Sequence, residues 1–379
     1  MSSNSKIASE SWISHMSNKV KAGGGINLAQ GIPGFGPPKL LLQILRNLSM
    51  EAVHQYPPGN GQADLVNLIC QNYKGLGQVS PDEVLIVQGA TEGVSLVYTY
   101  MNNQYGTDWS SMAFDPVYES YNELPKIFNN SLIKIPFAKG GEMDRDLCES
   151  ELKSNNVKLV FINSPGNPYG KIWTEEEFQW LFTLAEKYDF FILLDAVYKD
   201  LFYGDNAPFL PLEINRERLF YVNSFSKSLS ITGWRVGYLI SDNKRMKELR
   251  AIHDYTGLCA PSILQYSISK YLELTDYGAA YVENTRSSLS ENYYYLKPAL
   301  ENLGFTVAES GGGYFLWCEL PEKIGNGVDF ALSLYDKQKL GVVPGIHFSE
   351  DAHKWVRINI AREKEELKQA LKRIENFLK

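Results

Sequence analysis

Short runs of apolar residues alternate with segments of helical periodicity between about residues 60 and 260 of the sequence. The apolar runs have the length of strands and comprise residues 84–87, 158–162, 190–194 and 219–222. The helical segments between them include residues 62–73, 90–101 and 174–188. Because these strands are apolar at every position rather than at every second one, both faces of their sheet must be covered. The pattern therefore predicts an α/β fold with a mostly parallel sheet between layers of helices.

The pattern of the sequence changes near residue 281. A long helical stretch at 281–303 precedes a set of short strand-like runs, and a charged amphipathic helix follows at 364–378. The strand-like runs are residues 305–307, 314–318 and 355–360. The N-terminal segment fits neither pattern, and we expect it to cross between two domains. We therefore predict an N-terminal arm that also contributes to the small domain (1–42), a large α/β domain (43–280) and a small C-terminal α+β domain (281–379).

Composition excludes several classes of protein. The 379-residue chain has a formal net charge of -7 and scattered Lys and Arg residues, so we expect no nucleic-acid partner. It contains no run of about 20 apolar residues and begins without an apolar signal segment, so we expect no membrane partner. The four Cys residues lie far apart and, with the five His residues, form no ligand motif. This usage favours a cytoplasmic protein with reduced thiols and no bound metal.

Ligands of parallel α/β sheets bind beyond the carboxyl ends of the strands, and polar residues follow the predicted strands at these ends. Ala90 and Thr91 begin the helix after the strand at 84–87, where backbone N–H groups and a hydroxyl can bind an anion. The same residues also suit an ordinary strand-to-helix turn in which Thr91 is the N-cap. This segment alone does not decide between the two interpretations.

Asp195 directly follows the apolar run at 190–194, and Asn167 lies just beyond the run at 158–162. A carboxylate in this place could hold Mg²⁺ in a nucleotidase, but that enzyme would also need a phosphate-binding loop. The segment at 166–172 is one residue too short for such a loop and lacks its hydroxyl, so we set phosphoryl transfer aside. Asn167 suits either a plain loop or a hydrogen bond to a phenolic oxygen near Asp195.

Lys227 follows the strand at 219–222 and has Ser, Leu, Ile and Trp neighbours with few other charges nearby. Most lysines are solvated surface charges, but burial lowers the pKa of an amine and makes it a nucleophile that can form a Schiff base. Arg235 lies eight residues further on and could neutralise a phosphate, with Ser224 donating a hydroxyl hydrogen bond. None of these signals decides the function alone.

The order of these residues after successive strands is more specific than any one of them. In this order, and above all in the segment from Ser224-Phe225-Ser226-Lys227 to Arg235, the sequence resembles the class I and II aminotransferases. These are fold type I enzymes related to aspartate aminotransferase. The resemblance covers nearly the whole chain and is carried by residues 27–33, 56–61, 88–93, 115–118, 167–170, 195–198, 224–227, 233–237, 312–315, 344–345 and 356–358.

The resemblance implies that the cofactor is pyridoxal 5′-phosphate (PLP) and that Lys227 is its Schiff-base lysine and the catalytic proton shuttle. Asp195 would pair with the pyridine nitrogen, so that the ring accepts electrons from the substrate. Asn167 and Tyr198 would hydrogen-bond the phenolic oxygen, and Tyr118 would stack on the ring.

The phosphate of the cofactor would be held by one group of residues from the same chain, which comprises Ala90, Thr91, Ser224 and Arg235. The resemblance also implies that Tyr56 reaches the phosphate of the neighbouring subunit's cofactor. The protein would then be a homodimer with shared active sites.

Three residues would bind the substrate. The resemblance implies that Arg357 grips the α-carboxylate with two parallel hydrogen bonds, a geometry that lysine cannot reproduce. Without the resemblance, an exposed Arg on an alternating strand would be the simpler interpretation. Asn167 would lie beside the substrate, and Gly31 would let the N-terminal arm close over it.

The implied activity is ping-pong transfer of an amino group between an amino acid and a 2-oxo acid. A carbon–sulfur β-lyase on the same scaffold is the main alternative, because it uses the same Lys, Asp and Arg. A non-enzymatic PLP-binding regulator is a third, which usually carries a DNA-binding domain before the aminotransferase arm. The amino acid stays open, since a dicarboxylate pocket needs a second cation that sequence alone cannot place.

Overall fold

A computed structural model describes residues 11–138, 140–205 and 207–379. Its central feature is a seven-stranded sheet with the order β2-β8-β7-β6-β5-β3-β4. The strands are β2 (Val84–Val87), β3 (Ser110–Asp115), β4 (Ser131–Pro136), β5 (Val157–Asn163), β6 (Phe191–Asp195), β7 (Leu219–Ser224) and β8 (Gly237–Ile240). All neighbouring strands are parallel except at β8, which is antiparallel to both β2 and β7. The predicted mostly parallel sheet is therefore confirmed.

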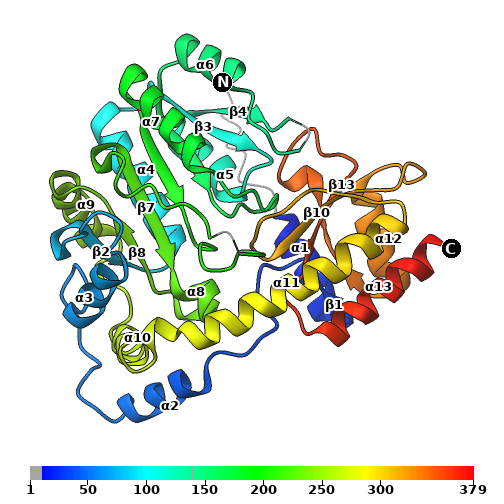
Figure 1. Ribbon diagram of the computed structural model, residues 1–379, viewed down its shortest axis with the longest axis horizontal. Coiled ribbons are helices and arrows are strands. Elements are labelled where there is room, and N and C mark those ends of the chain that lie inside the picture. The colour runs from blue at the N-terminus through cyan, green and yellow to red at the C-terminus, as the bar shows by residue number, and fades with distance from the viewer. Residues whose placement is uncertain (1–10, 139, 206) are drawn as a thin grey trace, which may run out of the picture.

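Two layers of helices cover this sheet (Figure 1). One face packs against α4 (Ala90–Tyr105), α5 (Glu119–Phe128) and α9 (Asn243–Thr256). The other packs against α2 (Lys39–Leu48), α3 (Ala63–Asn72), α6 (Arg145–Ser154), α7 (Glu175–Tyr188) and α10 (Ser262–Leu274). The strand β2 shows why its sequence is apolar at every position: Val84 and Ile86 pack against one layer of helices, and Leu85 and Val87 pack against the other.

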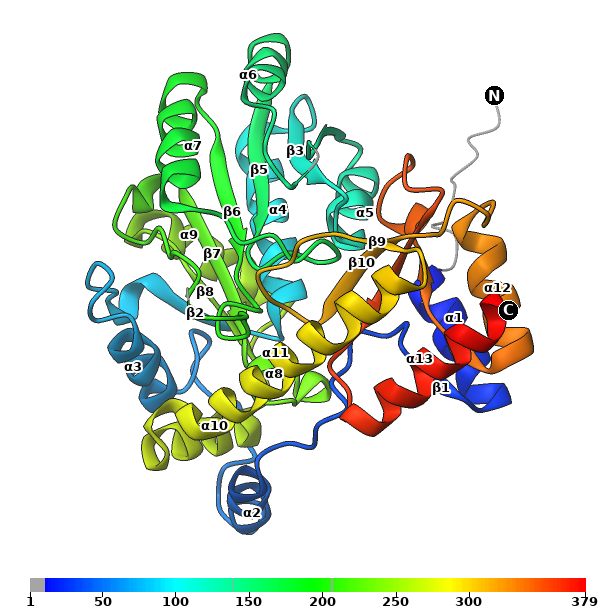
Figure 2. The same ribbon diagram turned by 45° about the vertical axis from the view of Figure 1, so that its right-hand side comes forward.

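A second core forms around a four-stranded antiparallel sheet with the order β12-β13-β10-β9. These strands are β9 (Thr306–Val307), β10 (Phe315–Glu319), β12 (Val343–Pro344) and β13 (Trp355–Asn359). Its helices are α1 (Trp12–Gly23), α11 (Ala279–Asn302), α12 (Gly327–Gln338) and α13 (Lys364–Leu378). Figures 1 and 2 show α11 running from beside α10 to these C-terminal elements. The α+β fold predicted for the C-terminal part is therefore confirmed.

The N-terminal arm joins the two cores. Helix α1 lies among the C-terminal elements, and β1 (Ile26–Asn27) pairs in parallel with β11 (Leu340–Gly341). The arm then passes along the end of β13, where the amide of Asn359 donates hydrogen bonds to the carbonyls of Gln30 and Ile32. It continues into α2, on the sheet side of the molecule.

The remaining elements are short. They comprise the one-turn helix α8 (Phe225–Ser228) and the 3₁₀ turns η1 (Pro81–Glu83), η2 (Arg216–Arg218), η3 (Thr232–Trp234), η4 (Asp276–Gly278) and η5 (Gly345–His347). Within the described part of the chain, no helix has both the length and the apolar composition needed to cross a membrane.

Candidate active site

A cavity of about 390 Å³ lies at the carboxyl ends of β5, β6 and β7, beside the first turn of α4 and beneath the N-terminal arm. Every site residue predicted from the sequence lines it except Tyr56. The predicted residues in its wall are Gly31, Ala90, Thr91, Tyr118, Asn167, Asp195, Tyr198, Ser224, Lys227, Arg235 and Arg357. The fold therefore brings together residues from both cores and from the arm.

Lys227 lies in α8, directly after β7; its side chain as a whole is half-buried, and its amine lies in the cavity wall beneath the arm. Its Nζ donates a hydrogen bond of 2.6 Å to the carbonyl of Gly31 and lies 5.8 Å and 5.7 Å from the ring centroids of Tyr198 and Tyr314. Burial, and to a smaller extent the nearby charge of Arg357, lowers the pKa of Lys227 to about 8, although Asp195 partly opposes the shift. An amine with this pKa is partly neutral at physiological pH, which a nucleophile requires.

Asp195 ends β6 and is buried in the wall of the same cavity. One carboxylate oxygen accepts a 2.8 Å hydrogen bond from the hydroxyl of Tyr121, and the other accepts one from the backbone N–H of Val197. Burial raises the pKa of Asp195, and the hydrogen bond from Tyr121 opposes this rise. A buried carboxylate facing a cavity favours a cationic or proton-donating ligand group. We did not predict Tyr121 from the sequence, although it lies one helical turn after Tyr118.

Arg357 on β13 is only 1% exposed and lies between the rings of Phe315 and Phe348. Its Nη1 donates to the side-chain oxygen of Asn167 at 2.9 Å, and its Nη2 donates to the carbonyl of Ala29 at 2.6 Å. Burial lowers the pKa of Arg357 to about 10, so the guanidinium remains charged at neutral pH.

No carboxylate of the described residues forms an ion pair with Arg357, although the charge of Glu119 favours the charged guanidinium. The buried Nε of Arg357 also has no hydrogen-bond partner within these residues. A buried guanidinium without an ion-pair partner favours an anionic ligand such as a carboxylate. The exposed-arginine interpretation of this residue is therefore wrong.

Asn163 holds the loop that carries Asn167, a role that we did not predict from the sequence. Its side-chain oxygen accepts a hydrogen bond of 2.6 Å from the backbone N–H of Asn167, and its amide donates to the carbonyl of Asp195 at 2.9 Å. These bonds fix the ends of β5 and β6 relative to each other. Because the side-chain oxygen of Asn167 is engaged by Arg357, its NH₂ group remains to donate into the cavity.

Another part of the cavity wall has features that favour an anion. Helix α4 begins after Gly89 without a side-chain cap, so its first N–H groups are available to an anion. Arg235 lies beside this turn, hydrogen-bonded to the carbonyls of Thr232 and Gln88 and without an ion pair in the described chain. Gly89 has a φ of 82°, and a Cβ there would collide with the guanidinium of Arg235. Glycine is thus required for this close approach.

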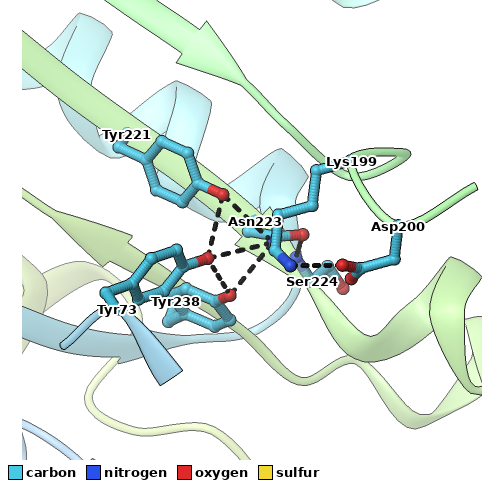
Figure 3. Close-up of polar contacts among 7 residues, drawn as sticks. All are labelled: Tyr73, Lys199, Asp200, Tyr221, Asn223, Ser224 and Tyr238. Atoms are coloured by element: carbon cyan, nitrogen blue, oxygen red, sulfur yellow. Dashed lines mark hydrogen bonds and ion pairs between the residues drawn. The ribbon is translucent and has the colours of Figure 1, made fainter. Parts of the chain in front are cut away.

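Ser224 connects the cavity with a buried polar group that we name the tyrosine cluster: Tyr73, Tyr221, Tyr238 and Asn223. The hydroxyl of Tyr73 lies 2.9 Å and 2.7 Å from those of Tyr221 and Tyr238, and all three point toward Asn223 (Figure 3). The side-chain oxygen of Asn223 accepts a hydrogen bond of 2.7 Å from the backbone N–H of Ser224. The cluster therefore fixes the strand end from which the turn to Lys227 begins.

The tyrosines of the site are buried to different extents. Tyr198 is 3% exposed, and burial raises the pKa of both Tyr198 and Tyr118, so both phenols stay protonated. Tyr56 is 82% exposed and does not line the cavity of its own chain. Its predicted contact concerns a neighbouring subunit, so that role stays a prediction.

A lysine of lowered pKa, a buried carboxylate and two arginines that suit anions lie in one cavity wall at the carboxyl edge of a mostly parallel sheet. This arrangement fits what a PLP-dependent enzyme of fold type I requires. Residues 24–374 match the family model described as aminotransferase class I and II, and the chain belongs to this family.

Similar proteins carry aminotransferase names. The chain is 30% identical to the aspartate aminotransferase of Thermotoga maritima, over 93% of this chain and 91% of that one. It is 28% identical to a probable N-succinyldiaminopimelate aminotransferase of Mycobacterium tuberculosis, over 93% and 92% of the two chains. The structure of YbdL from Escherichia coli, whose description names a methionine aminotransferase function, has a TM-score of 0.90, 23% identity and 99% coverage of both chains.

The chain is therefore a PLP-dependent aminotransferase, which moves an amino group between an amino acid and a 2-oxo acid. These findings give no support to the carbon–sulfur lyase alternative.

Proposed function

We propose that Lys227 binds PLP covalently and moves the substrate proton during amino transfer. The observation that carries this proposal is the buried amine whose pKa is about 8. Its surroundings also keep it in place, because Gly31 accepts a hydrogen bond from Nζ and two tyrosine rings enclose it. A proton carrier that works near neutral pH needs a pKa close to the working pH.

The residues around Lys227 suit both the pyridine nitrogen and the phosphate of PLP. When bound, PLP accepts the amino group and withdraws electrons from the Cα of the amino acid. Asp195, oriented by Tyr121, pairs with the pyridine nitrogen and keeps it protonated. Arg235, the first N–H groups of α4 at Ala90 and Thr91, and the hydroxyl of Ser224 hold the phosphate.

The polar groups between these ends orient the cofactor. The free NH₂ group of Asn167 and the protonated hydroxyl of Tyr198 donate hydrogen bonds to the phenolic oxygen. Tyr118, which begins α5 in the cavity wall, covers one face of the ring. Arg235, Asp195 and Asn167 come from three different segments, so they fix both the position and the direction of the ring.

Arg357 binds the α-carboxylate of the substrate, because no carboxylate of the described chain forms an ion pair with its buried guanidinium. Asn167 orients the guanidinium through its side-chain oxygen. Gly31 follows shortly after Ala29, whose carbonyl accepts a hydrogen bond from Arg357. A Cβ at Gly31 would lie 3.1 Å from Phe315 and 3.8 Å from the Nζ of Lys227. Any side chain at residue 31 would therefore narrow the space above the lysine.

Further proposals concern the whole assembly. The protein is a homodimer in which Tyr56, exposed in the single chain, reaches the cofactor phosphate of the partner. The two packed cores support a boundary near residue 280 and an arm that contributes to the small domain, but Leu41 packs with the large sheet, so the arm ends before α2 and not at residue 42. The free cysteines at 70, 148, 259 and 318 suit a cytoplasmic protein.

The proposal is tested by the variant Lys227→Ala. We expect it to lose the absorbance band of covalently bound PLP and at least about 10³-fold of the rate of amino transfer from an amino acid, because nucleophile and proton carrier are removed together. Lys199→Ala is the matched control, since Lys199 is also buried but does not line the cavity. A Lys227→Ala protein that kept the band and the rate would contradict the proposal.

A further inference from the structure

Two polar side chains, Glu92 and His253, lie next to the turn at which α4 begins. Glu92 belongs to the first turn of α4, and His253 belongs to α9. His253 is 0% exposed, and its Nε2 lies 3.6 Å from the carboxylate of Glu92. Within the described part of the chain, neither ring nitrogen of His253 has a hydrogen-bond partner. Neither residue lines the active-site cavity, so an effect of this pair on the cavity must pass through other residues.

Glu92 is bonded to the backbone just before the helix. Its carboxylate accepts a hydrogen bond from the backbone N–H of Gln88. Because Gln88 precedes the N-cap Gly89, this bond leaves the first N–H groups of α4 unoccupied. The carbonyl of Gln88 in turn accepts a hydrogen bond of 3.3 Å from the Nη2 of Arg235. Gln88 therefore links Glu92 with the arginine of the cavity wall.

The side chain of Gln88 fastens the same turn to the end of α9. Its amide donates a hydrogen bond of 2.9 Å to the carbonyl of Gly257, the C-cap of α9. Gly89, the next residue in the turn, has a φ of 82°, and a glycine restricts its own backbone less than any other residue does. The position of the turn therefore depends on the bonds that Gln88 makes to Glu92 and Gly257.

The carboxylate of Glu92 occupies a narrow space between α4 and α9. A Cβ at Gly257 would collide with this carboxylate and would lie 2.9 Å from the Nε2 of His253. Gly257 has a φ of -116° and a ψ of -29°, a conformation that other residues also adopt. Its glycine is therefore needed for space and not for the backbone. Gly257 and His253 together keep the carboxylate of Glu92 at the N–H of Gln88.

We propose that Glu92 is a positioning residue for the binding of the cofactor phosphate. It fixes Gln88, whose carbonyl orients Arg235 beside the first N–H groups of α4. The inference rests on the proposed binding of the phosphate by Arg235. All of these contacts are made within one chain, so they do not depend on what a neighbouring subunit adds to the phosphate site.

The experiment compares two ligands of the full-length protein after its cofactor has been removed. PLP and pyridoxal, which lacks the phosphate, are titrated separately, and the absorbance of the bound ligand gives each dissociation constant. In Glu92→Ala we expect the dissociation constant of PLP to rise about tenfold and that of pyridoxal to stay within about twofold, because the lost hydrogen bond acts on the phosphate site alone. An unchanged constant for PLP, or equal losses for both ligands, would overturn the proposal.

Two further variants separate the hydrogen bond from a general loss of stability. Glu92→Gln keeps an oxygen that can accept the N–H of Gln88, so its dissociation constant for PLP should lie within about threefold of the parent value. Glu177→Ala is the matched control, since Glu177 accepts the N–H of Thr174 at the start of α7 and does not line the cavity. Glu92→Gln binding PLP as weakly as Glu92→Ala, or an equal loss in Glu177→Ala, would refute the role of Glu92.

Gly257→Ala tests the same contact without changing Glu92. The added Cβ displaces the carboxylate, so the dissociation constant of PLP should rise about fivefold and that of pyridoxal should stay within about twofold. The double variant Glu92→Ala with Gly257→Ala should bind PLP no more weakly than Glu92→Ala does, because both changes act through one carboxylate. Losses that add up in the double variant would contradict this route.

Arg235→Ala distinguishes this inference from the proposed function. It should weaken the binding of PLP more than Glu92→Ala does and leave pyridoxal nearly unaffected, because the phosphate loses its cation. If Arg235→Ala weakens PLP and pyridoxal equally, the proposed phosphate site fails. If Arg235→Ala weakens only PLP while Glu92→Ala binds both ligands like the parent, only the inference on Glu92 fails.

Discussion

The active-site cavity and the neighbouring tyrosine cluster each adjoin a buried lysine, Lys227 and Lys199. Lys199 is paired with Asp200, and its ammonium lies 5.8 Å from the ring centroid of Tyr73 (Figure 3). Burial lowers the pKa of Lys199, but Asp200 and Tyr238 outweigh it, so the net shift is upward. Burial, with Arg357 and Arg235 nearby, lowers the pKa of Lys227 to about 8, and Asp195 opposes this shift only in part.

The comparison teaches that burial alone does not make a lysine reactive. Asp200 keeps the amine of Lys199 charged, so this lysine stabilises the fold and is not a nucleophile. Around Lys227 the nearest carboxylate, Asp195, is engaged by Tyr121. Burial leaves the amine of Lys227 partly neutral in spite of Asp195. Because the amine lies in a cavity wall, its neutral form can act as a nucleophile.

The largest expected difference between the two regions is in how far kcat falls when the carboxylate of each is replaced. Asp195→Asn removes the partner of the cofactor nitrogen and should lower kcat roughly 10²- to 10⁴-fold, since breaking a buried ion pair costs about 3–5 kcal/mol. Asp200→Asn should leave kcat within about twofold and lower the free energy of unfolding by about 1–2 kcal/mol. Steady-state kinetics and urea denaturation measure both. Equal losses of kcat in the two variants would remove the distinction between the regions.

A smaller difference in kcat is expected when a buried phenol of each region loses its hydroxyl. Tyr121→Phe removes a hydrogen bond to the charged Asp195 and should lower kcat about tenfold, because such bonds contribute about 1.5–3 kcal/mol. Tyr73→Phe removes only contacts within the tyrosine cluster, so its cost of about 1 kcal/mol should appear in the free energy of unfolding. If Tyr73→Phe lowered kcat more than Tyr121→Phe did, the cluster would be part of the catalytic machinery.

The smallest expected effect is a dependence on pH. In the cofactor-free protein, the rate at which Lys227 captures PLP should follow its neutral fraction. With a pKa of about 8, that fraction is about a tenth at pH 7 and one half at pH 8, so the capture rate should rise about fivefold over this interval. It should level off above about pH 9. Stopped-flow absorbance from pH 6 to 10 tests this, and a rate that kept rising tenfold per pH unit to pH 10 would indicate an unshifted lysine.

The sequence predicted the parts of the site that lie in continuous segments at strand ends. Asp195 and Lys227 directly follow apolar strands, and the fold brings such ends to one edge of the sheet. The helix at 364–378 was predicted with its observed bounds, because its apolar and charged residues alternate with helical periodicity. The strand β8 was missed, since its four residues follow the turn after Arg235 without a separating helix.

The remaining contacts depend on residues far apart in the chain. Gly31 and Lys227 are 196 residues apart, yet the carbonyl of one accepts a hydrogen bond from the amine of the other. The pairing of Ser11 and His347 with Glu119 likewise joins the N-cap of α1 to α5 and η5. No local pattern marks such partners, because each depends on how the two cores and the arm pack together.

The central claim is that Lys227, and not another buried amine such as Lys199, binds the cofactor covalently. Reduction of the purified holoenzyme with borohydride fixes the bond, and peptide mass spectrometry then locates the added mass. We predict one modified peptide, with the cofactor on Lys227. Modification of Lys199, or of any other lysine with Lys227 unmodified, would contradict this account.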